Sequence, residues 1–128
     1  MHRSRLTALV IDCHDMEAGI AFWTGALGTE AIRNDDPGDP YVTLEKKAGS
    51  LTLLLQRVPE TKACKSRIHL DIETDNVDAE VARLEALGAR RQQMIQGWWV
   101  MHDPNGNEFC VVPVQSREFP EGAATWGQ

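Results

Sequence analysis

RIHLDIETDNVDAEVARLEAL, residues 67–87, is the stretch that decides the fold, because it changes from the pattern of a strand to that of a helix. Polar and apolar residues alternate over residues 67–74, which is typical of a strand with one polar face. His69, Asp71 and Glu73 are therefore expected to share that polar face. A histidine beside two carboxylates makes this strand the first candidate for a functional site.

The second part of the stretch predicts a helix. Asp75 or Asn76 can accept a hydrogen bond from the first backbone N–H groups, and Gly88 suits the left-handed residue that ends many helices. Apolar residues recur at helical spacing at Val77, Val81, Leu84 and Leu87. The unit is thus a strand, a cap, a helix and a glycine.

Residues 6–28, LTALVIDCHDMEAGIAFWTGALG, repeat this unit near the start of the chain. Residues 15–18 (DMEA) align with 76–79 (NVDA), and residues 26–28 (ALG) align with 86–88 (ALG). The offset is 61 residues at the helix start (15 to 76) and 60 residues at the helix end (28 to 88). Such self-similarity indicates two copies of one folding unit.

Each half is expected to add three strands after its helix, which gives two β-α-β-β-β modules and an α+β fold. The predicted elements are strands at 6–12, 29–33, 41–46 and 50–58 with a helix at 15–28, then strands at 67–74, 89–94, 98–102 and 107–114 with a helix at 76–87. A hairpin turn is centred on Lys47–Gly49. Residues 6–114 should form a single domain of two modules, 6–58 and 67–114, followed by a C-terminal tail at 115–128.

The composition is that of an ordinary globular protein, with 42% apolar and 25% charged residues among 128. A net charge of −6 argues against a nucleic acid partner, because binding phosphates requires a basic face. No apolar run approaches the length of about 18 residues that a membrane span needs, so we expect a cytoplasmic protein with no membrane partner. Cys13, Cys64 and Cys110 have no CxxC spacing and are interpreted as reduced thiols.

Three motifs together resemble the vicinal oxygen chelate superfamily. They are Ile68-His69-Leu70-Asp71, VDAEVARLEALGA at 77–89, and DPNGNEFCVV at 103–112. Within the superfamily, the chain is most similar to glyoxalase-like domain proteins, the relatives of glyoxalase I, bleomycin resistance proteins and extradiol dioxygenases. The resemblance covers residues 6–114 and implies that the two modules form a curled mixed sheet around a cleft.

The resemblance also implies a divalent metal ion in that cleft, held by the first and last strands of each module. In the second module these positions fall on His69 and Glu108, an imidazole and a carboxylate of the kinds that bind borderline divalent metals. Glu108 is also the candidate catalytic residue. In the first module the positions fall on Ala8, which has no ligand atom, and near Leu54 or Gln56. Gln56 is the third candidate ligand, and the departure at Ala8 leaves a protein without any metal as the alternative.

Four further residues are candidates for contact with a small-molecule substrate. Asp71 shares the polar face of its strand with the histidine, and Cys110 should face the same way as the carboxylate two residues before it. Trp98 and Trp99 are adjacent on a strand, so one is expected in the core and the other in the cleft or at an interface.

Structural explanations stand beside each of these assignments. His69 and Glu108 would also be explained by a hydrogen bond between them, and Cys110 by small core filling. His14 and His102 are substitutes for the missing ligand if they face inward. Their direction is left open by the sequence.

Three functions are consistent with these residues. The first is a metal-dependent lyase, isomerase or dioxygenase, in which the ion chelates vicinal oxygens of a substrate and acts as a Lewis acid. The second is a metal-free protein that binds a small aromatic or amphipathic molecule without catalysis. The third is a structural dimerisation domain with a vestigial cleft. The resemblance further implies a homodimer.

Overall fold

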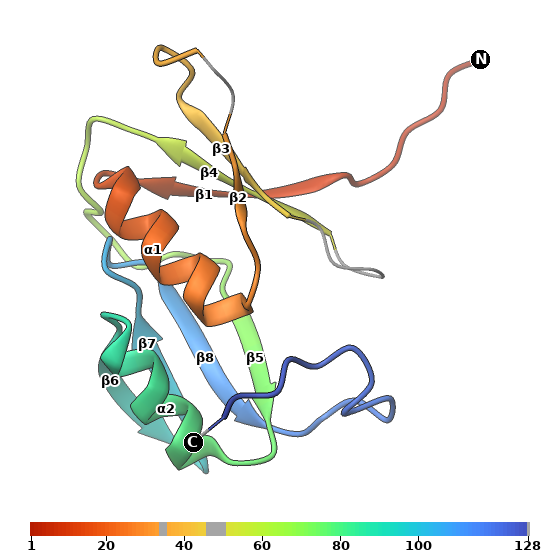
Figure 1. Cartoon of the computed structure of the whole chain (residues 1–128), viewed down its shortest axis with the longest axis vertical. Coiled ribbons are helices and arrows are strands. Elements are labelled where there is room, and N and C mark those ends of the chain that lie inside the picture. Colours follow the sequence, from red (N-terminus) through yellow and green to blue (C-terminus); the bar gives the residue numbers. More distant parts are fainter. Residues whose placement is uncertain (34–35, 46–50, 128) are drawn as a thin grey trace.

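The computed structural model describes residues 1–33, 36–45 and 51–127, which form two modules of the same β-α-β-β-β order (Figure 1). The first contains β1 (Ala8–Cys13), α1 (Met16–Leu27), β2 (Ala31–Ile32), β3 (Tyr41–Leu44) and β4 (Thr52–Arg57). The second contains β5 (Leu70–Thr74), α2 (Val77–Ala86), β6 (Arg90–Ile95), β7 (Trp98–His102) and β8 (Glu108–Pro113). The prediction of two such modules in an α+β fold is confirmed. The hairpin turn predicted at Lys47–Gly49 lies outside the described residues.

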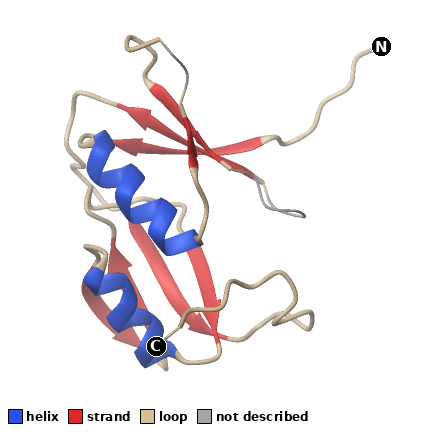
Figure 2. Ribbon diagram, in the orientation of Figure 1, coloured by secondary structure: helices blue, strands red, loops and turns tan. Residues whose placement is uncertain are grey.

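Each module has its own four-stranded mixed sheet in the described part of the chain (Figure 2). The strand order is β1-β4-β3-β2 in the first sheet and β5-β8-β7-β6 in the second. In both sheets the first strand is parallel to the last, and the other pairs are antiparallel. The repeat seen in the sequence is therefore a repeat of topology. The described strands form two open sheets that share no ladder.

The helix boundaries follow from their capping residues. The Asp15 carboxylate accepts a hydrogen bond from the Ala18 N–H at 3.0 Å, and the Asn76 side chain accepts one from the Ala79 N–H at 3.0 Å. Gly28 ends α1 in the left-handed region, with φ 64°. The two capping side chains fix where each helix starts, and the backbone of Gly28 fixes where the first helix stops.

The start of β5 differs from the sequence prediction. The ladder with β8 begins at Leu70, so His69 lies just before the strand rather than within it. Four residues earlier, the Ser66 N–H donates to the Glu108 carboxylate at the start of β8, at 3.2 Å. Alternation of polar and apolar residues does not show at which residue the pairing with β8 begins.

An aromatic cluster joins the two modules at their centre. Phe22 and Trp23 on α1 meet Phe109 on β8, with ring centroids 5.1 to 5.6 Å apart. All three side chains are almost completely buried. The helix of the first module therefore packs on the last strand of the second, and the two cores are continuous.

The turn between β7 and β8 contains a buried carboxylate that reaches across the modules. Asp103 is fully buried and accepts a hydrogen bond from the Trp23 indole N–H at 2.9 Å. It also accepts from the backbone N–H groups of Asn105 and Asn107 at 2.9 and 2.8 Å, and from the Asn107 side-chain amide at 3.1 Å. A buried carboxylate is costly unless hydrogen-bond donors replace the water that it loses, and Asp103 has such a set of donors.

The same turn binds the end of β1 and the loop before α1 through two asparagine side chains. Asn105 accepts from the Asp15 N–H at 2.7 Å and donates to the Asp15 carbonyl at 3.0 Å. Asn107 donates to the Asp12 carbonyl at 3.0 Å. We call Asp103, Asn105 and Asn107 the inter-module clasp. The DPNGN sequence thus joins the two halves of the chain.

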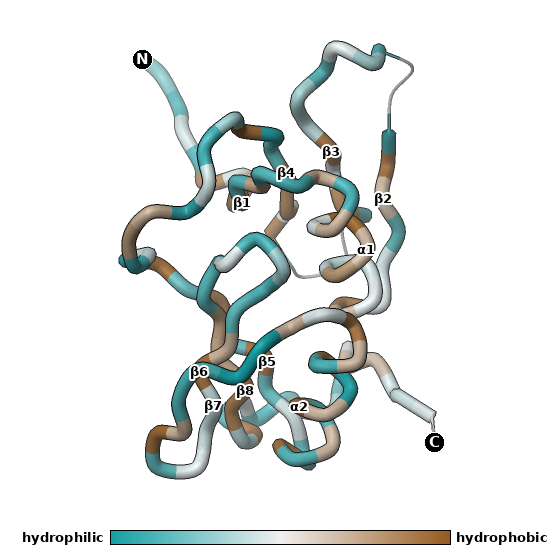
Figure 3. The backbone as a smooth tube through the Cα atoms, turned by 90° about the vertical axis from the view of Figure 1, so that its left-hand side faces the viewer, coloured by the Kyte–Doolittle hydropathy of each residue, from teal (hydrophilic) through white to brown (hydrophobic). Residues whose placement is uncertain are grey.

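The ends of the chain differ in how they relate to the modules. The N-terminal segment before β1 extends away from both sheets and is largely hydrophilic (Figure 3). The C-terminal tail after β8 instead folds back towards the helices, and its Trp126 ring lies 3.7 Å from the Arg83 guanidinium on α2. Among the described residues, no helix combines the length and the apolar character that crossing a membrane requires.

Candidate functional site

The second sheet covers the core with one face and leaves the other without a helix. Phe109, Val111 and Trp99 pack toward the core, so their sequence neighbours point to the opposite face. We call that opposite face of β5, β7 and β8 the open face. Its side chains are Asp71, Glu73, Glu108, Cys110, Val112, Trp98, Val100 and His102, and the parallel register places Asp71 beside Cys110.

Three residues of different chemistry converge at the start of the open face. One ligand atom each from His69, Asp71 and Cys110 lie within 4.8 Å of one another. The His69 Nε2 is 3.2 Å from the Asp71 Oδ1, and both side chains are about half exposed, at 53% and 48%. Cys110 is 6% exposed and lies beneath them. We call these three residues the His-Asp-Cys cluster.

The cysteine of the cluster is a protonated thiol in the absence of a cation. Burial raises the pKa of Cys110, the charge of Asp71 raises it further, and Lys65 has a weaker opposite effect. A thiol in such surroundings is a poor nucleophile. The cluster is therefore unsuited to cysteine-based nucleophilic catalysis and better suited to a metal ion, which ionises a coordinating thiol.

The Glu108 carboxylate forms its hydrogen bonds with residues outside the His-Asp-Cys cluster. Its carboxylate accepts a hydrogen bond from the Lys62 ammonium at 2.7 Å and from the Ser66 N–H at 3.2 Å. Burial raises the pKa of Glu108, but the hydrogen bonds from Lys62 and Ser66 outweigh it and lower that pKa to about 2. Glu108 is thus an ionised carboxylate that anchors the segment between the modules. Its assignment as a metal ligand and catalytic residue stays a prediction.

The first-module candidates lie on the other sheet. Gln56 is on β4, opposite Asp12 on β1 and Tyr41 on β3, and Ala8 is opposite Thr52. The His-Asp-Cys cluster draws its atoms from β5, β8 and the residue before β5. Gln56 as a third ligand likewise stays a prediction.

The two adjacent tryptophans divide as expected between the two faces of β7. Trp99 packs against the core and carries the Arg91 guanidinium 5.0 Å from its ring. Trp98 consequently points to the open face, beside Val100 and His102 on the same strand. The ring of His102 is held by Gln92, with 3.1 Å between Nε2 and Oε1. His14, on the loop before α1, is exposed.

A cavity of about 360 Å³ lies between β1 and the segment that leads into β5. Apolar side chains from β1 form one wall, and Trp23, Arg67 and Glu108 contribute to its lining. It adjoins the Glu108 anchor and belongs to both modules.

The grouping of Asp71 and Cys110 with His69 is what sequence reasoning missed. Both residues were expected to contact substrate, whereas the structure gathers them with the histidine into one potential ligand set. The signal that would have revealed it is the pairing of the first and last strands of a module in parallel, which brings residue 71 beside residue 110. That pairing requires a register, and the sequence pattern alone does not supply one.

Comparisons with known proteins agree with the architecture of two β-α-β-β-β modules and mixed sheets. Residues 8–112 match the family described as Glyoxalase-like domain. The chain belongs to this family, and solved structures of similar fold include a protein of the glyoxalase/bleomycin resistance/dioxygenase group. A comparison with curated proteins finds no match.

Three solved structures illustrate the shared fold. Glyoxalase I of Leishmania major, which is trypanothione-dependent, is 20% identical, with a TM-score of 0.65 over 87% of this chain and 87% of that chain. The fosfomycin resistance protein FosX of Mesorhizobium loti is 14% identical, with a TM-score of 0.70 over 91% and 97%. A mutant FosX of Listeria monocytogenes, complexed with Mn(II) and 1S,2S-dihydroxypropylphosphonic acid, is 16% identical, with a TM-score of 0.65 over 92% and 94%. At these identities the likeness concerns the fold.

Proposed function

We propose that the chain binds a divalent metal ion through His69, Asp71 and Cys110 and uses it to hold a small organic molecule on the open face. The observation that carries this proposal is the convergence of an imidazole, a carboxylate and a thiol within 4.8 Å. Support comes from the FosX relative that was solved with Mn(II) and a small phosphonic acid.

The donor set favours a borderline metal such as Zn²⁺ or Co²⁺ over Mg²⁺ or Mn²⁺, because thiolate is a soft ligand. Tetrahedral sites with metal–ligand bonds near 2.0 to 2.3 Å separate their ligand atoms by roughly 3.5 Å. The cluster spans up to 4.8 Å, and both His69 and Asp71 are half-exposed side chains that can rotate inward. The residues therefore fit a metal after a side-chain movement of about 1 Å.

Each residue has a distinct task in this proposal. Cys110 supplies a buried anionic ligand once its proton has left to solvent, and its rigid position on β8 fixes the depth of the site. His69 and Asp71 close the site from the solvent side. Bound there, the ion would act as a Lewis acid that polarises an oxygen of the small molecule. Trp98 lies on the same face and offers an apolar surface for the rest of that molecule.

The reaction classes proposed for this site are those of a metal-dependent lyase, isomerase or dioxygenase. All of them need a substrate oxygen held next to the ion, and three protein ligands leave a coordination position for it. Glu108 lines the neighbouring cavity, and its role as the catalytic residue stays a prediction, because a carboxylate with a pKa of about 2 is a weak base.

Cobalt binding tests the proposal without an assay of activity. Titrating the metal-free protein with Co²⁺ should give one equivalent of binding and a thiolate-to-cobalt charge-transfer absorption. Cys110→Ser should abolish that absorption, and His69→Ala should weaken binding by about 10- to 100-fold. Cys64→Ser is the matched control, because Cys64 is exposed and outside the cluster. An absorption that is missing, or that depends on Cys64, would remove the metal site.

A metal-free binding function is the second candidate, and the cavity of about 360 Å³ favours it. Its mixture of apolar wall, tryptophan and few charges is typical of small-molecule pockets, which measure about 300 to 1,000 Å³. Saturable quenching of tryptophan fluorescence by an aromatic ligand in the presence of a chelator would support this function. Absence of saturable binding across a panel of small aromatic molecules would count against it.

The outer face of the first sheet is the surface that we propose for the interface of the expected homodimer. Val10, Ile32 and Tyr41 are 43%, 57% and 44% exposed, and the strand register places them on the sheet face away from α1. Exposed apolar groups of this kind are frequent at interfaces between copies of a chain. Light scattering after size exclusion should give twice the mass of 14.3 kDa, and Val10→Glu should reduce it to one chain. A monomer at every concentration would contradict the dimer.

A further inference from the structure

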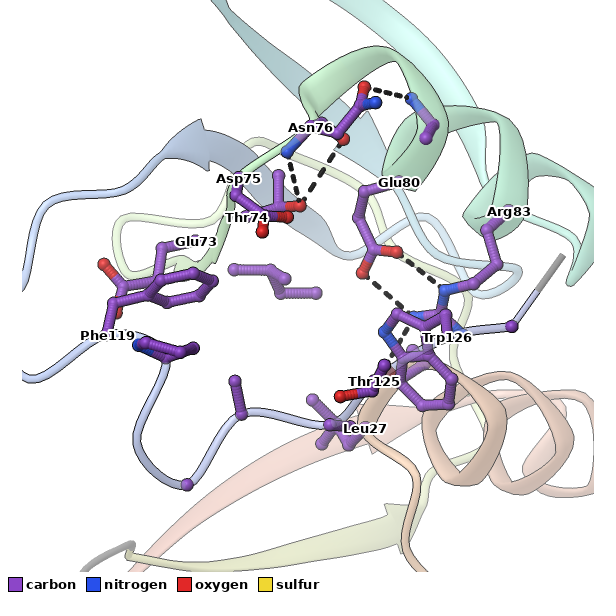
Figure 4. Close-up of a pocket in the computed structure, with 18 of the residues that line it drawn as sticks. Leu27, Glu73, Thr74, Asp75, Asn76, Glu80, Arg83, Phe119, Thr125 and Trp126 are labelled. Carbon is purple, nitrogen blue, oxygen red and sulfur yellow. Dashed lines mark hydrogen bonds and ion pairs between the residues drawn. The ribbon is translucent and has the colours of Figure 1, made fainter.

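A cavity with a volume of about 790 Å³ lies beneath the C-terminal tail. Figure 4 shows Glu73 and Phe119 at one side of it and Arg83, Trp126 and Thr125 at the other. Its floor is formed by the end of β5, the first turns of α2 and the last turn of α1. We call it the tail chamber. It uses none of the residues of the His-Asp-Cys cluster.

The tail is fixed at its two ends and bridges the space between them. At its start, the Glu73 carboxylate accepts from the Gln115 and Ser116 N–H groups at 2.8 and 2.9 Å and from the Ser116 hydroxyl. At its end, Trp126 stacks on Arg83. Two internal turns, at 118–121 and 120–123, shape the segment between these anchors. The tail is thus an arch, and the chamber is the space under it.

Arg83 fixes the far end of the arch, and its positive charge is paired with the Glu80 carboxylate and is not free for a ligand. It makes two hydrogen bonds to the Glu80 carboxylate, at 2.6 and 2.9 Å. It also donates to the carbonyls of Gly25 and Ala26 at the end of α1, at 2.9 and 2.8 Å. The Trp126 ring covers the guanidinium. Arg83 is therefore a structural joint between two helices and the tail.

The remaining charges around the chamber are negative. Glu73 and Glu80 are engaged as described, but Asp75 and Glu121 line the chamber without a cationic partner among the described residues. The rest of the lining includes Leu27, Ile72 and Phe119, which offer apolar and aromatic contact. Both carboxylates are exposed to water, and they would attract an ammonium group modestly and repel an anionic ligand.

We propose that the tail chamber binds a small organic cation that has an apolar body, such as an aromatic or aliphatic amine. The volume is within the range of about 300 to 1,000 Å³ that small-molecule sites occupy. The apolar floor would receive the body, and the carboxylates of Asp75 and Glu121 would receive the ammonium group. The proposal is independent of the metal site on the open face, because the two sites share no residue.

Calorimetric titration of the full chain at pH 7 with three matched probes tests the proposal. The probes are 2-phenylethylammonium, the neutral 2-phenylethanol and the anionic 3-phenylpropionate. The cation should bind saturably and about tenfold or more tightly than either of the others. Asp75→Asn and Glu121→Gln should each weaken it about threefold, and the double variant about tenfold, as expected for partly exposed charge pairs.

Glu118→Gln is the matched control, because Glu118 is on the same tail, carries the same charge and does not line the chamber. It should leave the affinity for 2-phenylethylammonium unchanged, as should His69→Ala and the addition of a chelator. Equal binding of the three probes, no saturable binding of the cation, or an equal loss in Glu118→Gln would each overturn the proposal. Loss of binding in His69→Ala would also overturn it, because the cation would then occupy the open face.

Discussion

Asp103 is a fully buried carboxylate whose hydrogen bonds come from N–H donors of a tryptophan, an asparagine side chain and two backbone groups. Removing it would leave those donors buried without a partner, which is more costly than the loss of the hydrogen bonds themselves. We expect Asp103→Ala to lower the free energy of unfolding by about 3 to 5 kcal/mol. Urea unfolding followed by circular dichroism measures this. Asp78→Ala on the exposed side of α2 is the control, with an expected change of about 0.5 kcal/mol or less.

The ion pair between Glu108 and Lys62 predicts a pH dependence of stability. The pKa of Glu108 is lowered to about 2, so the stabilisation is fully present above the ordinary carboxyl value of about 4.5 and is lost as pH falls toward 2. Lys62→Met should destabilise by about 1 to 3 kcal/mol near neutral pH, and this difference should shrink as pH falls from about 4.5 to 2. Lys65→Met, at an exposed neighbouring lysine, is the control. A difference that is constant down to pH 2 would contradict the pairing.

At the scale of the elements, α1 ends at a glycine that is constrained by its backbone conformation and by a close neighbouring side chain. Gly28 has φ 64°, and a Cβ on it would lie 2.8 Å from the Trp126 ring of the tail. Gly28→Ala should therefore destabilise by about 1 to 2 kcal/mol for the backbone alone, with an added loss as Trp126 is displaced from Arg83. Gly97→Ala separates the two effects, since Gly97 has φ 98° and open space around its Cα. Equal losses in the two variants, by thermal unfolding, would show that Trp126 does not rest on Gly28.

The elements could be predicted from the sequence wherever their boundaries are local. Asp15, Asn76 and Gly28 are capping residues of the expected types; the two helices begin beside Asp15 and Asn76, and α1 ends beside Gly28. The start of β5 at Leu70 could not be predicted, because it is set by pairing with β8, whose register the sequence pattern does not supply. The His-Asp-Cys cluster could not be predicted for the same reason. Its histidine was recognised, but the strand register that adds Asp71 and Cys110 is a long-range property.

At the scale of the whole molecule, the two modules share one core through α1 and β8. The aromatic cluster and the inter-module clasp meet at Trp23, which packs on Phe109 and donates to Asp103. Neither module can be complete without the other, so unfolding should be a single cooperative transition. Circular dichroism and tryptophan fluorescence should give the same urea midpoint, and Trp23→Phe should lower both midpoints together. Two separate transitions would argue against a shared core.

Because of the inter-module clasp, the linker peptide is not needed to hold the two modules together. Asn105 and Asn107 grip backbone atoms 90 and 95 residues away along the chain, so the halves are joined through space rather than through the linker. A nick between Glu60 and Thr61, outside the β4 ladder and before the Lys62 anchor, should leave two fragments that stay together as a native-like pair. The two halves could accordingly be encoded as separate polypeptides that find each other after synthesis.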